Sequence, residues 1–173
     1  MPRNDTGDAG CPVSPRPDPL TVLEFLRRQL AGELEAEDRT HLRYPTAVSR
    51  LLGLELVAVA ERSARIRFMA DVDKHGNQQG TIHSGTLCEL ADAAIGTAHS
   101  TVIGVDESFT SLDLNARFLR PSWSGPLTAD ARCTHAGRSI SQYTCEITRE
   151  DGKTVATVTS AVLTLRGEAA RGR

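Results

Sequence analysis

The sequence predicts an α+β domain in which an antiparallel sheet wraps around one long helix. The stretch from His75 to His99 begins as a Gly/Asn/Gln loop and continues as a helix of small residues. Two segments before this helix and four after it have the alternation or the β-branched content that is typical of strands. One long helix among strands favours a fold in which the helix covers one face of the sheet. Its apolar residues recur at helical spacing and should form a buried stripe: Leu87, Leu90, Ala91, Ala94 and Ala98.

The other elements follow in a simple order. Residues 20–34 carry leucines at helical spacing and predict an added helix packed on the domain. A membrane-surface helix is the weaker alternative there, because the polar face mixes Glu with Arg. Residues 45–52 predict a short helix that ends at Gly53, since glycine readily takes the left-handed cap. Strands are expected at 54–60, 64–72, 108–119, 127–136, 139–149 and 154–165, the last in the interior of the sheet.

The chain divides into four predicted parts. Residues 1–19 hold five of the eight prolines among polar residues and predict a disordered arm. A helix and a charged linker follow at 20–44, the folded domain spans 45–166, and 167–173 should be a flexible tail. Because the sheet would keep an open edge, we expect a homodimer or a tetramer of two dimers.

Composition excludes several classes of function. The formal net charge of -2 gives no basic field for nucleic acid or an anionic membrane, and no apolar run approaches the ~18 residues of a membrane span. The polar N-terminus lacks a secretory signal, and the four cysteines show no CxxC spacing, so we expect a cytoplasmic protein with reduced thiols. No His/Cys/Asp cluster has metal spacing, and no phosphate-binding glycine loop is present. The sequence therefore predicts no metal and no nucleotide cofactor.

Two carboxylates, Glu89 and Asp92, lie on the long helix away from its buried stripe. Thr86-x-x-Glu89 fits a capping box, so we assign Glu89 a structural role at the helix start. Asp92 is then the stronger candidate for chemistry, and a solvated helix residue is its plain alternative. The histidines 75, 99 and 135 are expected to have no chemical role.

One motif in the loop and helix resembles a known family. Asn77-x-x-Gly80-x-x-His83-Ser84-Gly85, followed by Leu90 and Asp92, resembles the N-x-x-G-x-x-H-G-G…D signature of hot-dog-fold acyl-CoA thioesterases, in the phenylacetate-pathway and 4-hydroxybenzoyl-CoA branch. Weaker matches follow in the expected order at 111–115, 118–121 and 135–139. The resemblance covers roughly residues 45–166 and implies the hot-dog fold.

The resemblance also implies a hydrolytic site. Asp92 would be the general base or nucleophile, facing the partner subunit, and the backbone N–H of Ser84 would polarise the thioester carbonyl. Asn77 would orient the thioester or water, and His83 with Gly85 would shape the carbonyl site. Ser111 would position water, with Thr110 as its register alternative. Ser84 stands where the family usually has glycine, which puts turnover and substrate fit in question more than the fold.

Coenzyme A would enter only as part of the substrate, so the resemblance implies no separate cofactor. Its phosphates call for cations and hydroxyls, and the residues near the family's nucleotide site are Arg120, Arg138, Ser139 and Arg166. Each of these is equally well explained as an ordinary surface residue. The expected substrate is an aryl- or short-to-medium-chain acyl-CoA, because a helix of small residues leaves room for a compact acyl group.

Other interpretations remain open for the same residues. A hot-dog module that binds acyl-CoA without cleaving it would have no need of Asp92. Asn77, Gly80 and Gly85 could serve only as turn residues, since Asn and Gly tolerate positive φ. Ser111, with Asp113 and Asn115 on the same strand face, could instead form a polar dimer seam. A hot-dog dehydratase is weaker, because the His-Phe-Pro type of loop is absent.

Overall fold

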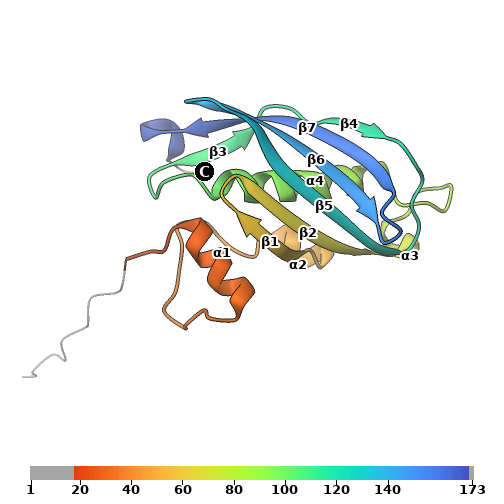
Figure 1. Cartoon of the computed structure of the whole chain (residues 1–173), viewed down its shortest axis with the longest axis horizontal. Helices are drawn as coiled ribbons and strands as arrows, with labels where there is room; N and C mark the ends of the chain where they lie inside the picture. The colour runs from red at the N-terminus through yellow and green to blue at the C-terminus, as the bar shows by residue number, and fades with distance from the viewer. Residues whose placement is uncertain (1–17, 172–173) are drawn as a thin grey trace, which may run out of the picture.

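The fold is a seven-stranded antiparallel sheet that curls around helix α4, as the computed structural model of residues 18–171 shows (Figure 1). The sheet order is β1-β2-β5-β6-β7-β3, with β4 also paired to β7. The predicted α+β class is therefore confirmed. The helices are α1 (Val22–Ala31), α2 (Ala47–Leu52), α3 (Val72–His75) and α4 (Ser84–Ser100), and a 3-10 helix spans Gly167–Ala170. The strands are β1 (Glu55–Ala60), β2 (Ser63–Ala70), β3 (Ser108–Ser111), β4 (Asn115–Phe118), β5 (Gly125–Ala136), β6 (Ile140–Arg149) and β7 (Thr154–Leu165).

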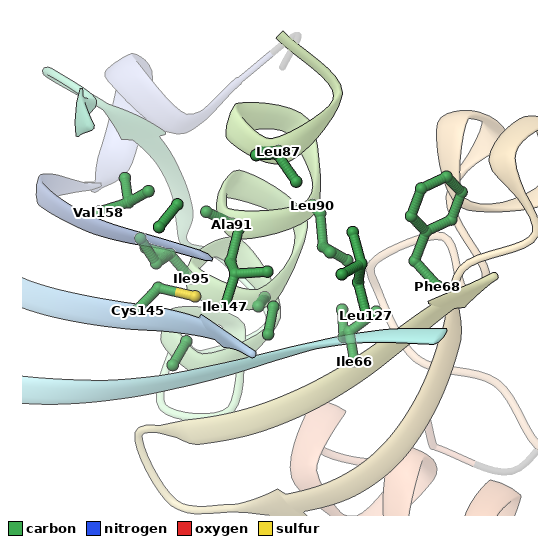
Figure 2. Packing of buried hydrophobic residues seen from close by; sticks show 14 of the residues in the cluster. Ile66, Phe68, Leu87, Leu90, Ala91, Ile95, Leu127, Cys145, Ile147 and Val158 are labelled. Carbon is green, nitrogen blue, oxygen red and sulfur yellow. The ribbon is translucent and has the colours of Figure 1, made fainter. Parts of the chain in front are cut away.

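The core lies between α4 and the concave face of the sheet. Figure 2 shows Leu87, Leu90, Ala91 and Ile95 of α4 pointing at apolar side chains from several strands. The predicted stripe of α4 is fully buried, and Ile95 extends it. Small residues let the strands come close to the helix, so the packing is tight without large side chains on α4. The strand residues of this cluster that the figure labels are Ile66, Phe68, Leu127, Cys145, Ile147 and Val158.

Strand β2 shows the alternation that the sequence predicts. Ile66, Phe68 and Ala70 are buried, whereas Arg65 and Arg67 are exposed on the convex face. The exposed arginines pair with carboxylates on neighbouring strands, for example Arg67 with Glu55 at 2.8 Å. Period-two patterning thus fixes which face of the sheet meets the helix. The interior placement of β7 is confirmed as well, because β6 lies on one side of it and β3 with β4 on the other.

The segment 108–119 differs from the single strand that was predicted. It forms two short strands, β3 and β4, which both pair with β7. The interruption has a local cause at Asp113: its carboxylate accepts the backbone N–H of Ala161 at 3.0 Å, and its carbonyl accepts the Ser160 hydroxyl at 2.7 Å. Because the side chain of Asp113 replaces a backbone partner, the ladder stops there and resumes at Asn115.

The N-terminal additions flank β1. Helix α1 begins after the Thr21 cap and packs near β1 (Figure 1). Its buried residues are Val22 and Leu26, while Leu30 is 41% exposed, so only part of the leucine pattern of this segment faces the domain. Helix α2 ends at Gly53 in the left-handed region, as predicted.

The structure covers only part of the arm and of the tail that were predicted for the two ends of the chain. Residues 1–17 of the expected arm and residues 172–173 of the expected tail lie outside the described residues. Within 18–171, no helix combines the length and the apolar character needed to cross a membrane.

Candidate active site

The loop before α4 is held by its own backbone. The N–H of His83 donates to the carbonyl of His75 at 2.8 Å, and the N–H of Asn77 donates to the carbonyl of Thr81 at 2.8 Å. The Asn77 carboxamide oxygen accepts the N–H of Gln79 at 2.9 Å, and its amide group donates to the Thr81 hydroxyl at 3.0 Å. Asn77 is therefore engaged inside the loop, where it acts as an Asx-turn residue. Its predicted role toward a thioester or water stays a prediction.

His83 caps helix α4. Its Nδ1 accepts the N–H of Gly85 at 2.9 Å, which satisfies one of the donors that a helix start leaves unpaired. A Cβ on Gly85 would lie 3.0 Å from that same nitrogen, so glycine keeps room for the imidazole. These contacts fit the predicted part of His83 and Gly85 in shaping the loop.

The N–H of Ser84 is left without a hydrogen bond anywhere in residues 18–171. Ser84 is the first residue of α4 and is exposed, so its amide lies at the positive end of a long helix dipole. A free amide at this place is suited to a carbonyl oxygen that gains negative charge. The His83 imidazole thus engages the N–H of Gly85, and the N–H of Ser84 is left as the available donor.

The capping box predicted at Thr86 and Glu89 is wrong. The helix cap is His83, three residues earlier, so Thr86 and Glu89 both lie within the helix. The Glu89 side chain makes no hydrogen bond or ion pair with any described residue. Its partial burial, and then the nearby charge of Asp92, raise the pKa of the Glu89 carboxyl above its usual value.

Asp92 and Ser111 are brought together by the packing of β3 on α4. The Ser111 hydroxyl donates to the Asp92 carboxylate at 2.9 Å, and both residues are half-buried. Nearby, a Cβ added to Gly96 of α4 would lie 3.5 Å from the ring of Phe109, so β3 runs close to this part of the helix. Thr110, the register alternative, instead bonds its neighbour's carbonyl at 3.4 Å. The geometry selects Ser111 as the partner of Asp92.

Ser84 and Asp92 do not face each other within one chain. They are separated by eight residues of the same helix, which corresponds to about 12 Å along its axis. One thioester cannot touch both the Ser84 amide and the Asp92 carboxylate of a single copy. A site that uses both groups must therefore combine two copies.

The predicted coenzyme A residues are divided between the two ends of β7. Arg120 donates to the carbonyl of Thr154, where β7 begins. Arg166 follows its last residue, Leu165, and donates to the carbonyl of Arg138 at 2.9 Å. At ~3.3 Å per residue, the two ends of a strand of this length lie roughly 35 Å apart. Ser139 belongs with Arg138 and Arg166, because its carbonyl accepts the N–H of Thr164 next to Leu165.

A cavity of about 260 Å³ lies beside the start of α4. The loop contributes Asn77 and Thr81, the helix contributes Ser84 and Leu87, and the third wall is the segment 118–122, which begins at the last residue of β4. Sequence patterns gave no sign of this third wall beyond a Phe-Leu-Arg-Pro match, because residues 119–122 belong to no regular element. Within residues 18–171, no group of three or more His, Cys, Asp or Glu side chains is arranged to hold a metal.

Comparisons with known proteins identify the class. Residues 79–156 match the family that is described as "Thioesterase superfamily". The acyl-coenzyme A thioesterase PaaI of Escherichia coli K12 is 30% identical over 125 residues, which are 70% of this chain and 86% of PaaI. The medium/long-chain acyl-CoA thioesterase YigI of Salmonella typhimurium LT2 is 27% identical over 135 residues, 69% of this chain and 86% of YigI.

The solved structure of E. coli PaaI has the same fold, with a TM-score of 0.68 over 86% of this chain and 98% of that chain, at 23% identity. The curled sheet around α4 is therefore a hot-dog fold. The chain belongs to the thioesterase superfamily, as a PaaI-like member, and it is an enzyme of that family. The predicted family and fold are both confirmed.

Proposed function

We propose that this enzyme hydrolyses an acyl-CoA thioester to the free acid and coenzyme A in a site shared by two copies of the chain. The free N–H of Ser84 at the head of α4 carries the proposal, because it is a donor with no partner in the described fold. The name and similarity of PaaI support acyl-CoA as the substrate class. A homodimer would bring the Asp92 carboxylate of the second copy opposite that amide.

The chemistry follows from these two groups. The Ser84 N–H binds the thioester carbonyl oxygen and stabilises the negative charge that develops on it. Asp92 takes a proton from water, whose oxygen attacks the carbonyl carbon, and the C–S bond then breaks. The coenzyme A thiolate leaves and takes up a proton. The Ser111 hydroxyl holds the Asp92 carboxylate in one orientation throughout.

The dimer would also bring the divided coenzyme A residues together. Arg120 lies at one end of β7 and the Arg138–Ser139–Arg166 group lies at the other, so a two-fold axis could place unlike ends beside each other. Arg166 is already paired with Glu107 at 2.6 Å, so its guanidinium would keep that contact while binding a phosphate. Homodimer, tetramer and cytoplasmic location remain parts of this proposal.

Thiol release from a panel of CoA thioesters tests the activity. Aryl, short-chain and medium-chain substrates are assayed with wild type and with Asp92→Asn. We expect wild type to be active and Asp92→Asn to lose ~10²- to 10⁴-fold in kcat while it still binds coenzyme A. Glu89→Gln is the matched control, one turn away on the same helix, and should keep most of the activity. Wild-type rates in Asp92→Asn would remove Asp92 from the mechanism, and binding without any turnover would favour the non-catalytic module.

Mixed dimers test whether the site is shared. Asp92→Asn and Ser84→Pro each disable one half, and mixing them restores one complete site in every heterodimer. If the copies exchange freely, half of the dimers are mixed, so about a quarter of the wild-type activity should return. No recovery after verified exchange would contradict a site built from two copies.

A further inference from the structure

We propose that Ser122 is a substrate-positioning residue that bonds the amide next to the sulfur in the pantetheine arm of the coenzyme A thioester. This inference rests on the proposed function and deepens it. Ser122 lines the cavity that also contains Ser84. It lies in the segment that follows β4 and belongs to no regular element, so no sequence pattern pointed to it.

The hydroxyl of Ser122 lacks a partner. Ser122 is 1% exposed, and its Oγ is buried without a hydrogen bond to any described residue. Buried polar groups are paired in the great majority of cases, so an unpaired one points to a bound water, a ligand or a catalytic part. The neighbouring Ser124 provides the contrast, because its Oγ accepts the N–H of Val72 at 3.0 Å.

The backbone ties Ser122 to the carbonyl-binding end of the helix. Its carbonyl accepts the N–H of Ile82 at 2.9 Å, and Ile82 directly precedes the cap residue His83. The backbone of Ser122 is thus held next to the loop that presents the Ser84 amide. The cavity's other polar side chains are partly used: Asn77 and Thr81 bond each other, and Arg120 bonds a carbonyl of β7. Ser122 is the buried hydroxyl in this wall that still needs a partner.

The chemistry of a coenzyme A thioester supplies such a partner. When the thioester carbonyl lies at the Ser84 amide, the thiol arm extends from the sulfur through two methylenes to an amide. A hydroxyl can donate to the carbonyl of that amide or accept its N–H. Leu87 and the exposed Phe118 and Leu119 line the same cavity and suit the methylenes.

Three benzoyl thioesters separate this role from a general one. Benzoyl-CoA and the thioester of N-acetylcysteamine contain the amide, whereas the thioester of 2-mercaptoethanol lacks it. For Ser122→Ala we expect KM to rise roughly 2- to 12-fold on the two amide-containing substrates, with kcat little changed, because one neutral hydrogen bond is lost. The mercaptoethanol thioester should be hydrolysed as by wild type. Ser124→Ala is the matched control and should leave all three substrates unaffected.

The outcomes are distinguishable. A loss of equal size on all three thioesters, or no change on any, would overturn the assignment of Ser122 while leaving the proposed function in place. If wild type hydrolyses none of the three, the proposed function fails and this inference fails with it. Ser122→Cys, which keeps a similar volume and a weaker hydrogen-bonding group, is measured beside Ser122→Ala and should show a smaller rise in KM. Thermal unfolding of each variant confirms that it is folded.

Discussion

The two halves of α4 have opposite surroundings. In the first half, Ser84 is exposed with an unpaired amide, and Asp92 is half-buried with one bond to Ser111. In the second half, His99 is 1% exposed and bonds Tyr143 at 3.1 Å and Thr164 at 3.0 Å. The difference arises because β3 and β7 cover the end of the helix and leave its beginning open. The open half should therefore govern activity, and the closed half should govern stability.

Removal of the Ser84 amide should give the largest effect. Proline is well tolerated at the first position of a helix and has no N–H, and the extended conformation of His83 suits a residue before proline. Ser84→Pro should lower kcat by ~10²- to 10³-fold, which corresponds to about 2.7–4 kcal/mol of transition-state stabilisation. Steady-state kinetics measure the loss. Ser84→Ala keeps the amide and should stay close to wild type, and a similar loss in both variants would contradict the role of the amide.

The closed half should make stability depend on pH through His99. Burial, and then the charge of Arg62, lower the pKa of His99 to about 4. The unfolded state binds a proton below the ordinary pKa of about 6.5, whereas the folded state resists it down to about 4. The contribution of His99 to the free energy of unfolding is therefore fully present above pH 6.5. It falls by roughly 3 kcal/mol as the pH drops toward 4.

Urea unfolding between pH 7.5 and pH 4.5 checks the His99 prediction. His99→Gln cannot titrate, so its free energy of unfolding should fall less steeply over this range, even though the variant is less stable at neutral pH. The difference between the two slopes removes the contribution of carboxylates that both proteins share. Parallel slopes would show that His99 does not control the acid response.

Ser111→Ala should have an intermediate effect on the open half. Its hydroxyl is the one described partner of the Asp92 carboxylate, and a hydrogen bond to a charged group contributes about 1.5–3 kcal/mol. Because Asp92 would lose its fixed orientation, we expect kcat to fall roughly 10- to 100-fold with little change in KM. Ser111→Thr keeps a hydroxyl and should recover part of the rate. A change in KM alone would place Ser111 in substrate binding.

The cap residue should give the smallest effect. His83→Ala removes the acceptor for the Gly85 N–H and should lower the free energy of unfolding by about 1 kcal/mol. His83→Asn offers another side-chain acceptor at the cap and should restore most of that stability. Thermal unfolding measures both variants. If His83→Ala abolished hydrolysis at unchanged stability, the imidazole would have a chemical role beyond capping.

Sequence patterns predicted the elements that depend on local periodicity. The buried stripe of α4, the two faces of β2 and the left-handed end of α2 at Gly53 follow from spacing and residue type alone. The patterns failed where a side chain, and not the backbone, made the deciding hydrogen bond. Asp113 interrupts the strand after α4 by bonding Ala161 of β7, a contact between residues 48 apart. Similarly, the imidazole of His83 took the cap that local motifs had assigned to Thr86.

By itself, the sequence determined the fold class, the family motif and the position of Asp92 away from the buried stripe of the central helix. These features depend on periodicity and residue type. Tertiary structure alone decided that Ser111 contacts Asp92, that Ser84 keeps an unpaired amide, and that Ser122 has a buried hydroxyl without a partner. It also separated Arg120 from Arg166 along β7. These facts arise from which strands and loops pack together, and spacing along one chain does not encode such long-range contacts.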